Sequence, residues 1–214
     1  MKLRRFNELA EDRGAPPEFR FALLSIHGVR TTGHWQKYMT VPLQRAGILY
    51  EPLDWGYHWL APLTRPRATA EAQVPAVVAA WKTHDADGLH VCAAAHSFGT
   101  LILGRTLQLN PDVRLRRIVL FGSILRGTFP WGELAKRKQV TQVLNETCPD
   151  DRAVKFAHLL PCKWTGRSGC YGFAASKVVQ NRRYDWMGHS DAGHRLHVEK
   201  VWIPFLLHGT VPPP

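Results

Sequence analysis

The segment around Ser97 has the residue types and the spacing of a nucleophile held on a sharp turn. Ala95-His96-Ser97-Phe98-Gly99 follows one apolar run and opens another. In a nucleophile elbow, a strand, a tight turn and a helix point the serine hydroxyl out of the sheet, and small flanking residues let the strand and helix approach closely. The alternative is an ordinary serine N-cap on a helix over residues 98–109.

A second segment could supply the backbone donors that a serine nucleophile requires. Acyl transfer develops a negative oxygen, which two N–H groups stabilise. Phe98, which follows the nucleophile, offers one N–H, and Val29, after the run that ends at His27-Gly28, is the candidate for the other. The alternative for His27-Gly28 is a plain strand-to-loop turn. The candidate substrate-binding residues are His27, Gly28, Arg30 and His96.

A serine nucleophile also needs a base, and the base needs an acid that orients it. His189 lies in the loop Met-Gly-His-Ser-Asp, after the last predicted strand. Asp150 and Asp151 follow an earlier strand, and either is a candidate for the acid; the alternative is a solvated turn carboxylate or a cap for residues 152–160. His194 and His197 are interpreted as surface or packing residues.

The elements that must position these residues alternate between strands and helices. Apolar runs predict strands at 19–28, 48–50, 89–95, 117–121, 140–144 and 176–180. Helices are expected at 34–46, 74–83, 98–109, 152–160 and 193–207, with irregular segments at 124–138 and 162–174. Alternating strands and helices predict a mostly parallel, doubly wound α/β sheet with helices on both faces. We expect one domain over residues 19–208, a loosely ordered lead-in at 1–18 and a tail at 209–214.

Composition limits the classes of protein to consider. The chain has 214 residues and a formal net charge of +11, with basic residues scattered rather than gathered in a tail. Such a surface is either simply solvated or a patch that attracts anionic partners, such as phospholipid in an anionic membrane surface, nucleic acid or an acidic substrate. The N-terminus lacks the apolar region of a secretory signal, and no run is long enough to span a membrane, so we expect a cytoplasmic protein.

The cysteines and histidines give little sign of a metal site. Cys92 lies in an apolar run and is expected to be a buried free thiol, whereas a Cys162–Cys170 bridge stays open. The other cysteines lack paired CxxC spacing, and no HExxH motif is present. We therefore expect no metal and no cofactor.

The combined motifs resemble those of the α/β-hydrolase superfamily, and within it a group of small bacterial serine esterases and lipases. The segments that carry the resemblance are HGVRTTGHWQ, AHSFGTLILGRTL, IVLFGS, NETCPDD, SGCYGF, NRR and GHSD, across about residues 21 to 206. The chain order of Ser97, an aspartate and His189 is the order of this superfamily. The resemblance favours Asp151 over Asp150 as the acid and points to His189 as the base.

The resemblance implies a minimal α/β-hydrolase fold with little or no cap domain, because only 124–138 and 162–174 leave room for insertions. Two departures stand out: Ala95 replaces the first glycine of the elbow, and we expect the first strands of the full superfamily sheet to be absent. The implied activity is hydrolysis of a small-molecule or lipid ester through an acyl-enzyme. Aromatic residues such as Trp35, Trp55 and Trp164 suit an apolar acyl chain, although packing is the alternative.

Other functions are compatible with parts of the same sequence pattern. Thioesters and amides use the same machinery, and a hydrolase-fold protein without catalysis would act by binding. A metal hydrolase using His189, Asp191 and His194 would leave the serine elbow unexplained. The positive charge alone is weak support for a nucleic-acid-binding module, and no specific nucleic acid is expected as a partner. The oligomeric state is not readable from the sequence.

Overall fold

One parallel sheet of six strands organises the chain in the computed structural model, which describes residues 19–29, 33–57 and 60–213. Its order is β2-β1-β3-β4-β5-β6, and every neighbouring pair is parallel. Near-continuous apolar runs form the central strands, as expected for strands buried on both faces. The strands are β1 (Phe21–Ile26), β2 (Ile48–Leu53), β3 (His90–His96), β4 (Leu115–Phe121), β5 (Val140–Thr147) and β6 (Val179–Arg183).

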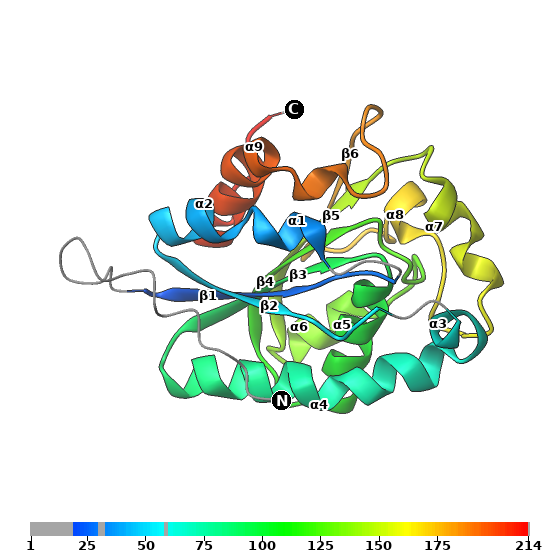
Figure 1. Ribbon diagram of the computed structural model, residues 1–214, viewed down its shortest axis with the longest axis horizontal. Helices are drawn as coiled ribbons and strands as arrows, with labels where there is room; N and C mark the ends of the chain where they lie inside the picture. The colour runs from blue at the N-terminus through cyan, green and yellow to red at the C-terminus, as the bar shows by residue number, and fades with distance from the viewer. Residues whose placement is uncertain (1–18, 30–32, 58–59, 214) are drawn as a thin grey trace.

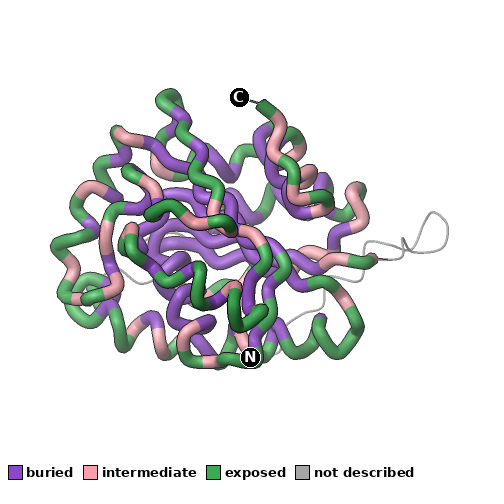
Figure 2. The backbone as a smooth tube through the Cα atoms, turned by 180° about the vertical axis from the view of Figure 1, so that it is seen from behind, coloured by how far each residue is buried: buried purple, intermediate pink, exposed green. Residues whose placement is uncertain are grey.

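Helices cover both faces of the sheet, as Figure 1 shows. One face carries α4 (Pro66–Ala86), α5 (Phe98–Leu109) and α6 (Trp131–Lys136), whose apolar side chains join one core cluster. The other face carries α1 (His34–Lys37), α2 (Thr40–Arg45), α9 (Arg195–His197) and α10 (Ile203–His208), around Trp35 and Trp202. The buried strands run between these two layers in Figure 2. The predicted α/β architecture is thus confirmed.

The strand order reverses direction between β1 and β3. The chain places β2 on one side of β1, and then crosses to add β3, β4, β5 and β6 on the other side. Ligands of open α/β sheets bind at such a switch point, outside the carboxyl ends of the strands. Here the two strands end at Ile26 and His96, so His27-Gly28 and Ser97 emerge next to each other.

Two predicted helices differ from those in the structure. The helix predicted over 74–83 is α4, which begins at Pro66, so Pro75 lies inside it rather than in its first turn. Buried Ala70, Val74 and Val77 hold α4 against the core, which offsets the backbone hydrogen bond that Pro75 cannot donate. The helix predicted over 34–46 is two short helices, α1 and α2, with a turn at Tyr38 and Met39.

The terminal helix predicted over 193–207 is also divided. After α9, residues Val198–Trp202 form a π-helical turn, and α10 follows with Pro204 in its first turn. Pro204 has no N–H, so the regular hydrogen-bond ladder is interrupted at the point where the π turn ends. The tail beyond it is not simply frayed: Arg182 Nη1 donates to the carbonyl of Pro212 at 2.5 Å.

The remaining differences are local. The last strand lies at Val179–Arg183, three residues later than predicted, and the segments expected to be irregular contain α6 and α8 (Ser168–Tyr171). The helix predicted over 152–160 is α7 (Arg152–Phe156) followed by a 3₁₀ turn, Ala157–Leu159. Residues of α7 and α8 pack into the core, so in the described part of the chain no separate cap lies over the sheet.

The structure bears on the expectations about membrane-spanning helices and about the cysteines. No helix among the described residues is both long and apolar enough to cross a bilayer. All four cysteines are free, so Cys162 and Cys170 do not form a bridge. Cys92 is buried as predicted, and burial raises the pKa of its thiol to about 12. The lead-in expected at 1–18 lies outside the described residues.

Candidate active site

The backbone at Ser97 adopts the conformation of a nucleophile elbow. Ser97 has φ 51° and ψ −120°, and it is one of only two non-glycine residues with positive φ in the described part of the chain. Such a conformation costs on the order of 1–3 kcal/mol, so the surroundings must enforce it. The Ser97 N–H donates to the carbonyl of Phe121 at 3.1 Å, which ties the turn to the end of β4.

Two glycines permit the close packing around this turn. A Cβ on Gly99 would lie 2.4 Å from the carbonyl oxygen of Ile26, so the first turn of α5 rests directly on the end of β1. A Cβ on Gly28 would lie 2.8 Å from the Cβ of Ser97. The loop after β1 and the elbow are therefore in contact, as the topology requires.

The side chain of Ser97 does not cap α5. The helix has no side-chain cap hydrogen bond, and among the described residues nothing hydrogen-bonds to the Ser97 hydroxyl. Thr100 instead donates its hydroxyl to the Ser97 carbonyl at 2.6 Å, within the first turn. The N-cap alternative is thereby excluded, and the hydroxyl is left unengaged where the sheet's carboxyl edge opens.

Asp151 and His189 form a hydrogen-bonded acid–imidazole pair. Nδ1 of His189 lies 2.6 Å from Oδ2 of Asp151. The Asp151 side chain is only 1% exposed, whereas that of His189 is 28% exposed and therefore accessible from solvent. The other carboxylate oxygen, Oδ1, accepts from Val154 N–H at 3.1 Å and caps α7. Both oxygens are thus fixed, and the imidazole is held with its Nε2 directed away from the carboxylate.

The structure separates the two candidate acids. Asp150 is 89% exposed on its side chain, and its Oδ1 accepts from Lys155 Nζ at 3.1 Å. Of the two, only Asp151 meets His189 among the described residues. Asp151 also performs the capping role that sequence analysis had offered as its alternative, so the two roles coexist.

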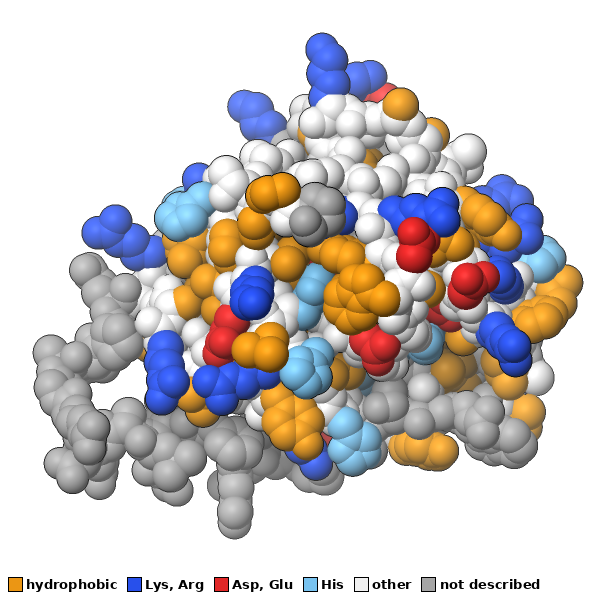
Figure 3. Space-filling view, turned by 90° about the horizontal axis from the view of Figure 1, so that it is seen from above, with side chains coloured by type: hydrophobic (Ala, Val, Ile, Leu, Met, Phe, Trp, Pro, Cys, Tyr) orange, Lys and Arg blue, Asp and Glu red, His pale blue; other side chains and the backbone are white. Residues whose placement is uncertain are grey.

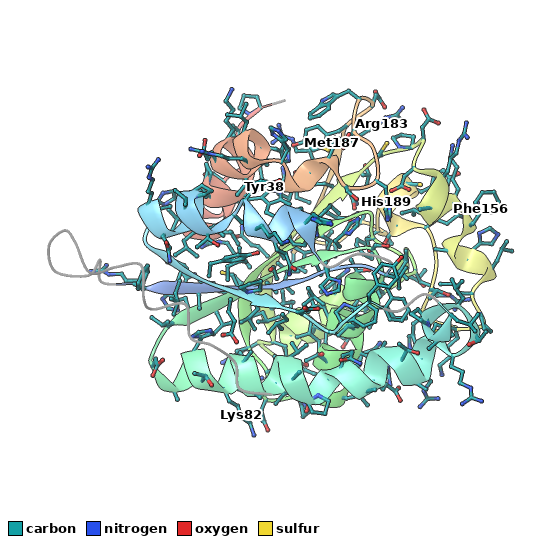
Figure 4. All side chains as sticks on the ribbon, viewed as in Figure 1. Tyr38, Lys82, Phe156, Arg183, Met187 and His189 are labelled. Carbon is teal, nitrogen blue, oxygen red and sulfur yellow. The ribbon has the colours of Figure 1, made fainter. Side chains whose placement is uncertain are left out.

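His189 lies at the end of β4, beside the elbow. A Cβ on Gly122 would come within 2.9 Å of Cε1 of His189, so the ring occupies the space that a side chain at 122 would need. Gly122 directly follows Phe121, whose carbonyl accepts from Ser97 N–H. Figure 4 shows His189 on the side of the sheet that carries α9, toward the end where the strands finish. His189 and Ser97 thus lie at one edge of the sheet.

His96 contacts both the backbone and the ring of His189. Its Nε2–H donates to the carbonyl of His189 at 2.9 Å, and the two rings lie 4.6 Å apart between centroids. Burial and the neighbouring His189 hold the pKa of His96 well below its usual range, so the ring is neutral and can both donate and pack. His96 also stacks on Phe121 at 4.6 Å.

His27 orients the loop that carries the second candidate donor. Nδ1–H of His27 donates to the carbonyl of Gly28 at 2.8 Å. The Val29 N–H belongs to the same trans peptide group as this carbonyl and therefore points in the opposite direction. Trp55 fixes His27 in turn: its indole N–H donates to the His27 carbonyl at 2.9 Å, and the two rings stack. Among the described residues neither the Val29 nor the Phe98 N–H has an acceptor, so both remain available to an oxyanion.

Two of the candidate substrate-binding residues have other places in the structure. His27 is fully buried and His96 nearly so, which means that neither side chain lies at a surface where substrate could touch it; they position the loop and His189 instead. Arg30 lies outside the described residues. Sequence analysis missed the roles of Trp55 and Gly122, and the only available signal was the glycine that directly follows a strand.

Two cavities lie in this region of the structure. A void of about 10 Å³ lies behind Asp151 and His189, and a cavity of about 940 Å³ lies on the α9 side. Ser97 lines neither of these two cavities. Within the described residues, no group of three His, Cys, Asp or Glu side chains could hold a metal ion, and Asp191 accepts from Gly188 N–H instead.

The same architecture occurs in solved structures of other proteins. A predicted CIB-like hydrolase from Thermoplasma acidophilum is similar with a TM-score of 0.60 and 14% identity, over 87% of this chain and 86% of that one. The protein TT1662 from Thermus thermophilus has a TM-score of 0.59 and 17% identity, over 90% of each chain. Est1E from Butyrivibrio proteoclasticus, solved with ferulic acid bound, has a TM-score of 0.59 and 12% identity, over 89% of this chain and 90% of that one. No protein-family model and no curated protein matches the sequence.

Proposed function

We propose that this protein, which has the α/β-hydrolase fold, is a serine hydrolase that cleaves carboxylic esters through a Ser97-His189-Asp151 triad. The observation that carries the proposal is the 2.6 Å bond between Asp151 and His189, made at the same sheet edge where Ser97 is held in an elbow with a free hydroxyl. An ordinary structural serine would cap its helix, and an ordinary surface histidine would not have a buried carboxylate behind it.

The mechanism follows from these roles. Nε2 of His189 takes the proton of the Ser97 hydroxyl as the oxygen attacks the ester carbonyl. Asp151 keeps the proton of the imidazole on Nδ1 and stabilises the imidazolium that forms. The N–H groups of Val29 and Phe98 hold the oxyanion, and the N-terminus of α5 favours the same charge. The alcohol leaves with the proton from His189, and water activated by His189 then cleaves the acyl-enzyme.

Three observations support a substrate class. The names of two structural neighbours refer to esters or their acids: Est1E was solved with ferulic acid, and LipS and LipT are described as lipolytic enzymes. Trp55 stacks on Phe98, directly beside the elbow, so an apolar acyl group would find an aromatic wall there. The net charge of +11 suits esters presented at an anionic lipid surface. The proposed substrate is therefore a small-molecule or lipid ester. The proposed reaction takes place in the cytoplasm and uses no cofactor.

A fluorophosphonate probe tests the proposed nucleophile. The folded protein should be labelled covalently and with saturation, whereas Ser97→Ala should not be labelled at all. Ser25→Ala is a matched control, because Ser25 is buried at the other end of a hydrogen-bond pair with Tyr50. Equal labelling of wild type and Ser97→Ala would remove the assignment, and no labelling of wild type would favour a binding protein that has the fold without the activity.

Esters of different length then test the substrate class. p-Nitrophenyl esters of short and long acids, with and without anionic vesicles, separate a lipid esterase from an esterase of small molecules. We expect long-chain esters to be cleaved faster when vesicles are present. A short-chain preference without any effect of vesicles would contradict the lipid part of the proposal, and faster cleavage of matched thioesters or amides would redirect it to those substrates.

A further inference from the structure

A second cavity lies apart from the Ser97 site, on the side of the sheet that carries α9. It has a volume of about 940 Å³, which is within the range of small-molecule sites. Its lining includes Trp35, Tyr184, Trp186 and Leu196, and it also reaches Arg182 on β6. Figure 3 looks onto this side of the molecule, where hydrophobic side chains gather with Lys and Arg side chains around them.

Buried polar groups around this cavity lack partners. Arg182 is only 9% exposed, yet its Nε has no hydrogen-bond partner, and the indole N–H of Trp35 has none either within the described chain. Both residues line the cavity. A buried donor without an acceptor is costly, and native proteins rarely leave one that way. Both atoms lie beneath the cavity surface, so a ligand in the cavity could meet Arg182 only through its terminal Nη groups.

The charge of Arg182 has no carboxylate partner among the described residues. Glu146 is its register neighbour on β5, but the two oxygens of Glu146 are used by His197 Nε2 at 2.6 Å and Trp202 Nε1 at 2.9 Å. Among the described residues Arg182 forms no ion pair: its Nη1 donates to the Pro212 carbonyl, and its guanidinium lies over the ring of Tyr184, 5.1 Å from the centroid. A guanidinium buried without a carboxylate is unfavourable unless an anion arrives to pair with it.

The other charges of the lining fit the same ligand. Glu199 pairs with Arg195 at 2.8 Å, and Asp191 accepts from the Gly188 N–H at 2.6 Å, so both carboxylates are already engaged. Lys200 adds a cation that has no ion-pair partner in the described part of the chain. The net character of the cavity is therefore an apolar, aromatic body with an unpaired cation at its wall.

We propose that this cavity is a binding site for a carboxylate with an apolar tail, such as a medium-chain fatty acid. The carboxylate would pair with Arg182, for which a guanidinium offers two parallel donors, while the tail would lie against Trp186 and Leu196. The ligand would also contact Ser190, Asp191 and Gly193, which line the cavity and belong to the loop that carries His189. The site is separate from Ser97 and does not depend on the proposed hydrolysis.

Binding of decanoate, followed by tryptophan fluorescence and by calorimetry below its critical micelle concentration, tests the site. Decan-1-ol and decyltrimethylammonium have the same tail without the negative charge. We expect saturable binding of one decanoate, at least about tenfold tighter than decan-1-ol, because a buried guanidinium strongly favours an anion. Equal affinity for decan-1-ol would overturn the role of charge, and absence of decanoate binding would overturn the site.

Variants locate the ligand. Arg182→Met should weaken decanoate at least about tenfold, whereas Arg182→Lys should retain part of the affinity because it keeps the charge. The matched control is Arg183→Met: Arg183 is the next residue on β6, but it is exposed and pairs with Asp185. If Arg182→Met does not fold, Leu196→Asp at the exposed rim provides the second test by repelling the carboxylate. Unchanged affinity in both Arg182→Met and Leu196→Asp would refute the proposal.

Discussion

Asp151→Asn is the sharpest test of the acid, because the structure fixes both oxygens of Asp151. Oδ1 accepts from Val154 N–H and Oδ2 meets His189 Nδ1. If the asparagine keeps its oxygen on Val154, its NH₂ faces His189 and forces Nδ1 to accept. The proton of the imidazole then moves to Nε2, so this nitrogen can no longer accept the proton of the Ser97 hydroxyl and the ring can no longer act as a base.

The alternative rotamer has its own cost. A flipped amide would restore the hydrogen bond to Nδ1–H but would set two donors, the NH₂ and Val154 N–H, against each other in a site that is 1% exposed. Losing the cap costs about 1 kcal/mol, and a buried unsatisfied donor costs about 1–3 kcal/mol more. A total near 3 kcal/mol corresponds to about 10² in rate at 1.36 kcal/mol per decade. The wrong tautomer corresponds to about 10⁴.

We therefore expect Asp151→Asn to lower kcat for a p-nitrophenyl ester by about 10² to 10⁴, with KM changed little. Thermal unfolding should show a change of at most about 1 kcal/mol, since one oxygen can still cap α7. Asp150→Asn is the matched control and should alter kcat less than about twofold, because Asp150 is exposed and pairs only with Lys155. A severe loss in Asp150→Asn together with a mild effect of Asp151→Asn would refute the assignment of the acid.

Two further predictions concern the space around His189 and the long helix below the sheet. Gly122→Ala should lower kcat at least about tenfold, because the new Cβ would come within 2.9 Å of the His189 ring at a residue with φ 54°; ester kinetics measure this, and Gly132→Ala, with nothing within 4 Å, should leave kcat unchanged. Burial alone would raise the pKa of Glu71, but hydrogen bonds from Arg105 and Arg67 outweigh it and lower that pKa. Since the folded-state pKa lies below the unfolded value of about 4.3, the stabilisation is present above that pH and is lost as the pH falls through the folded-state pKa. Glu71→Gln should thus destabilise by up to about 1 kcal/mol at pH 7 and by less near pH 3, as measured by urea unfolding; an equal destabilisation at both pH values would contradict the ion-pair explanation.

The parts of the fold that were predictable are those encoded by local runs. The strand before Ser97 and the helix after it are contiguous apolar segments with a turn between them, so α5 was predicted with its observed bounds, Phe98–Leu109. The start of α4 was not predictable in this way. Residues 66–73 contain charged and small side chains, and only their packing beneath the sheet, with Ala70 fully buried, makes that stretch helical.

The choice between neighbouring residues also depended on tertiary structure. Asp150 and Asp151 are equivalent in a sequence pattern, because both follow the same strand and precede the same short helix. Their difference arises from the direction in which each side chain leaves the turn: one enters the space beneath His189 and the other enters solvent. His96 and His27 were predicted near the substrate for a similar reason, since a sequence places a residue at a sheet edge but does not say whether its side chain turns inward.

The position of His189 connects the two sites proposed for this protein. The imidazole of His189 hydrogen-bonds to Asp151 and packs closely against Gly122, and His96 donates a hydrogen bond to the backbone carbonyl of His189. The residues that follow it, Ser190 to Gly193, form a wall of the apolar cavity, and Gly193 packs against Trp35 so closely that a Cβ would lie 2.7 Å from that side chain. Trp35 in turn makes an edge contact with His96. A ligand that repositioned Trp35 would therefore act on the same imidazole from two directions, through the loop and through His96, whereas a ligand that only filled the outer rim would leave His189 where it is.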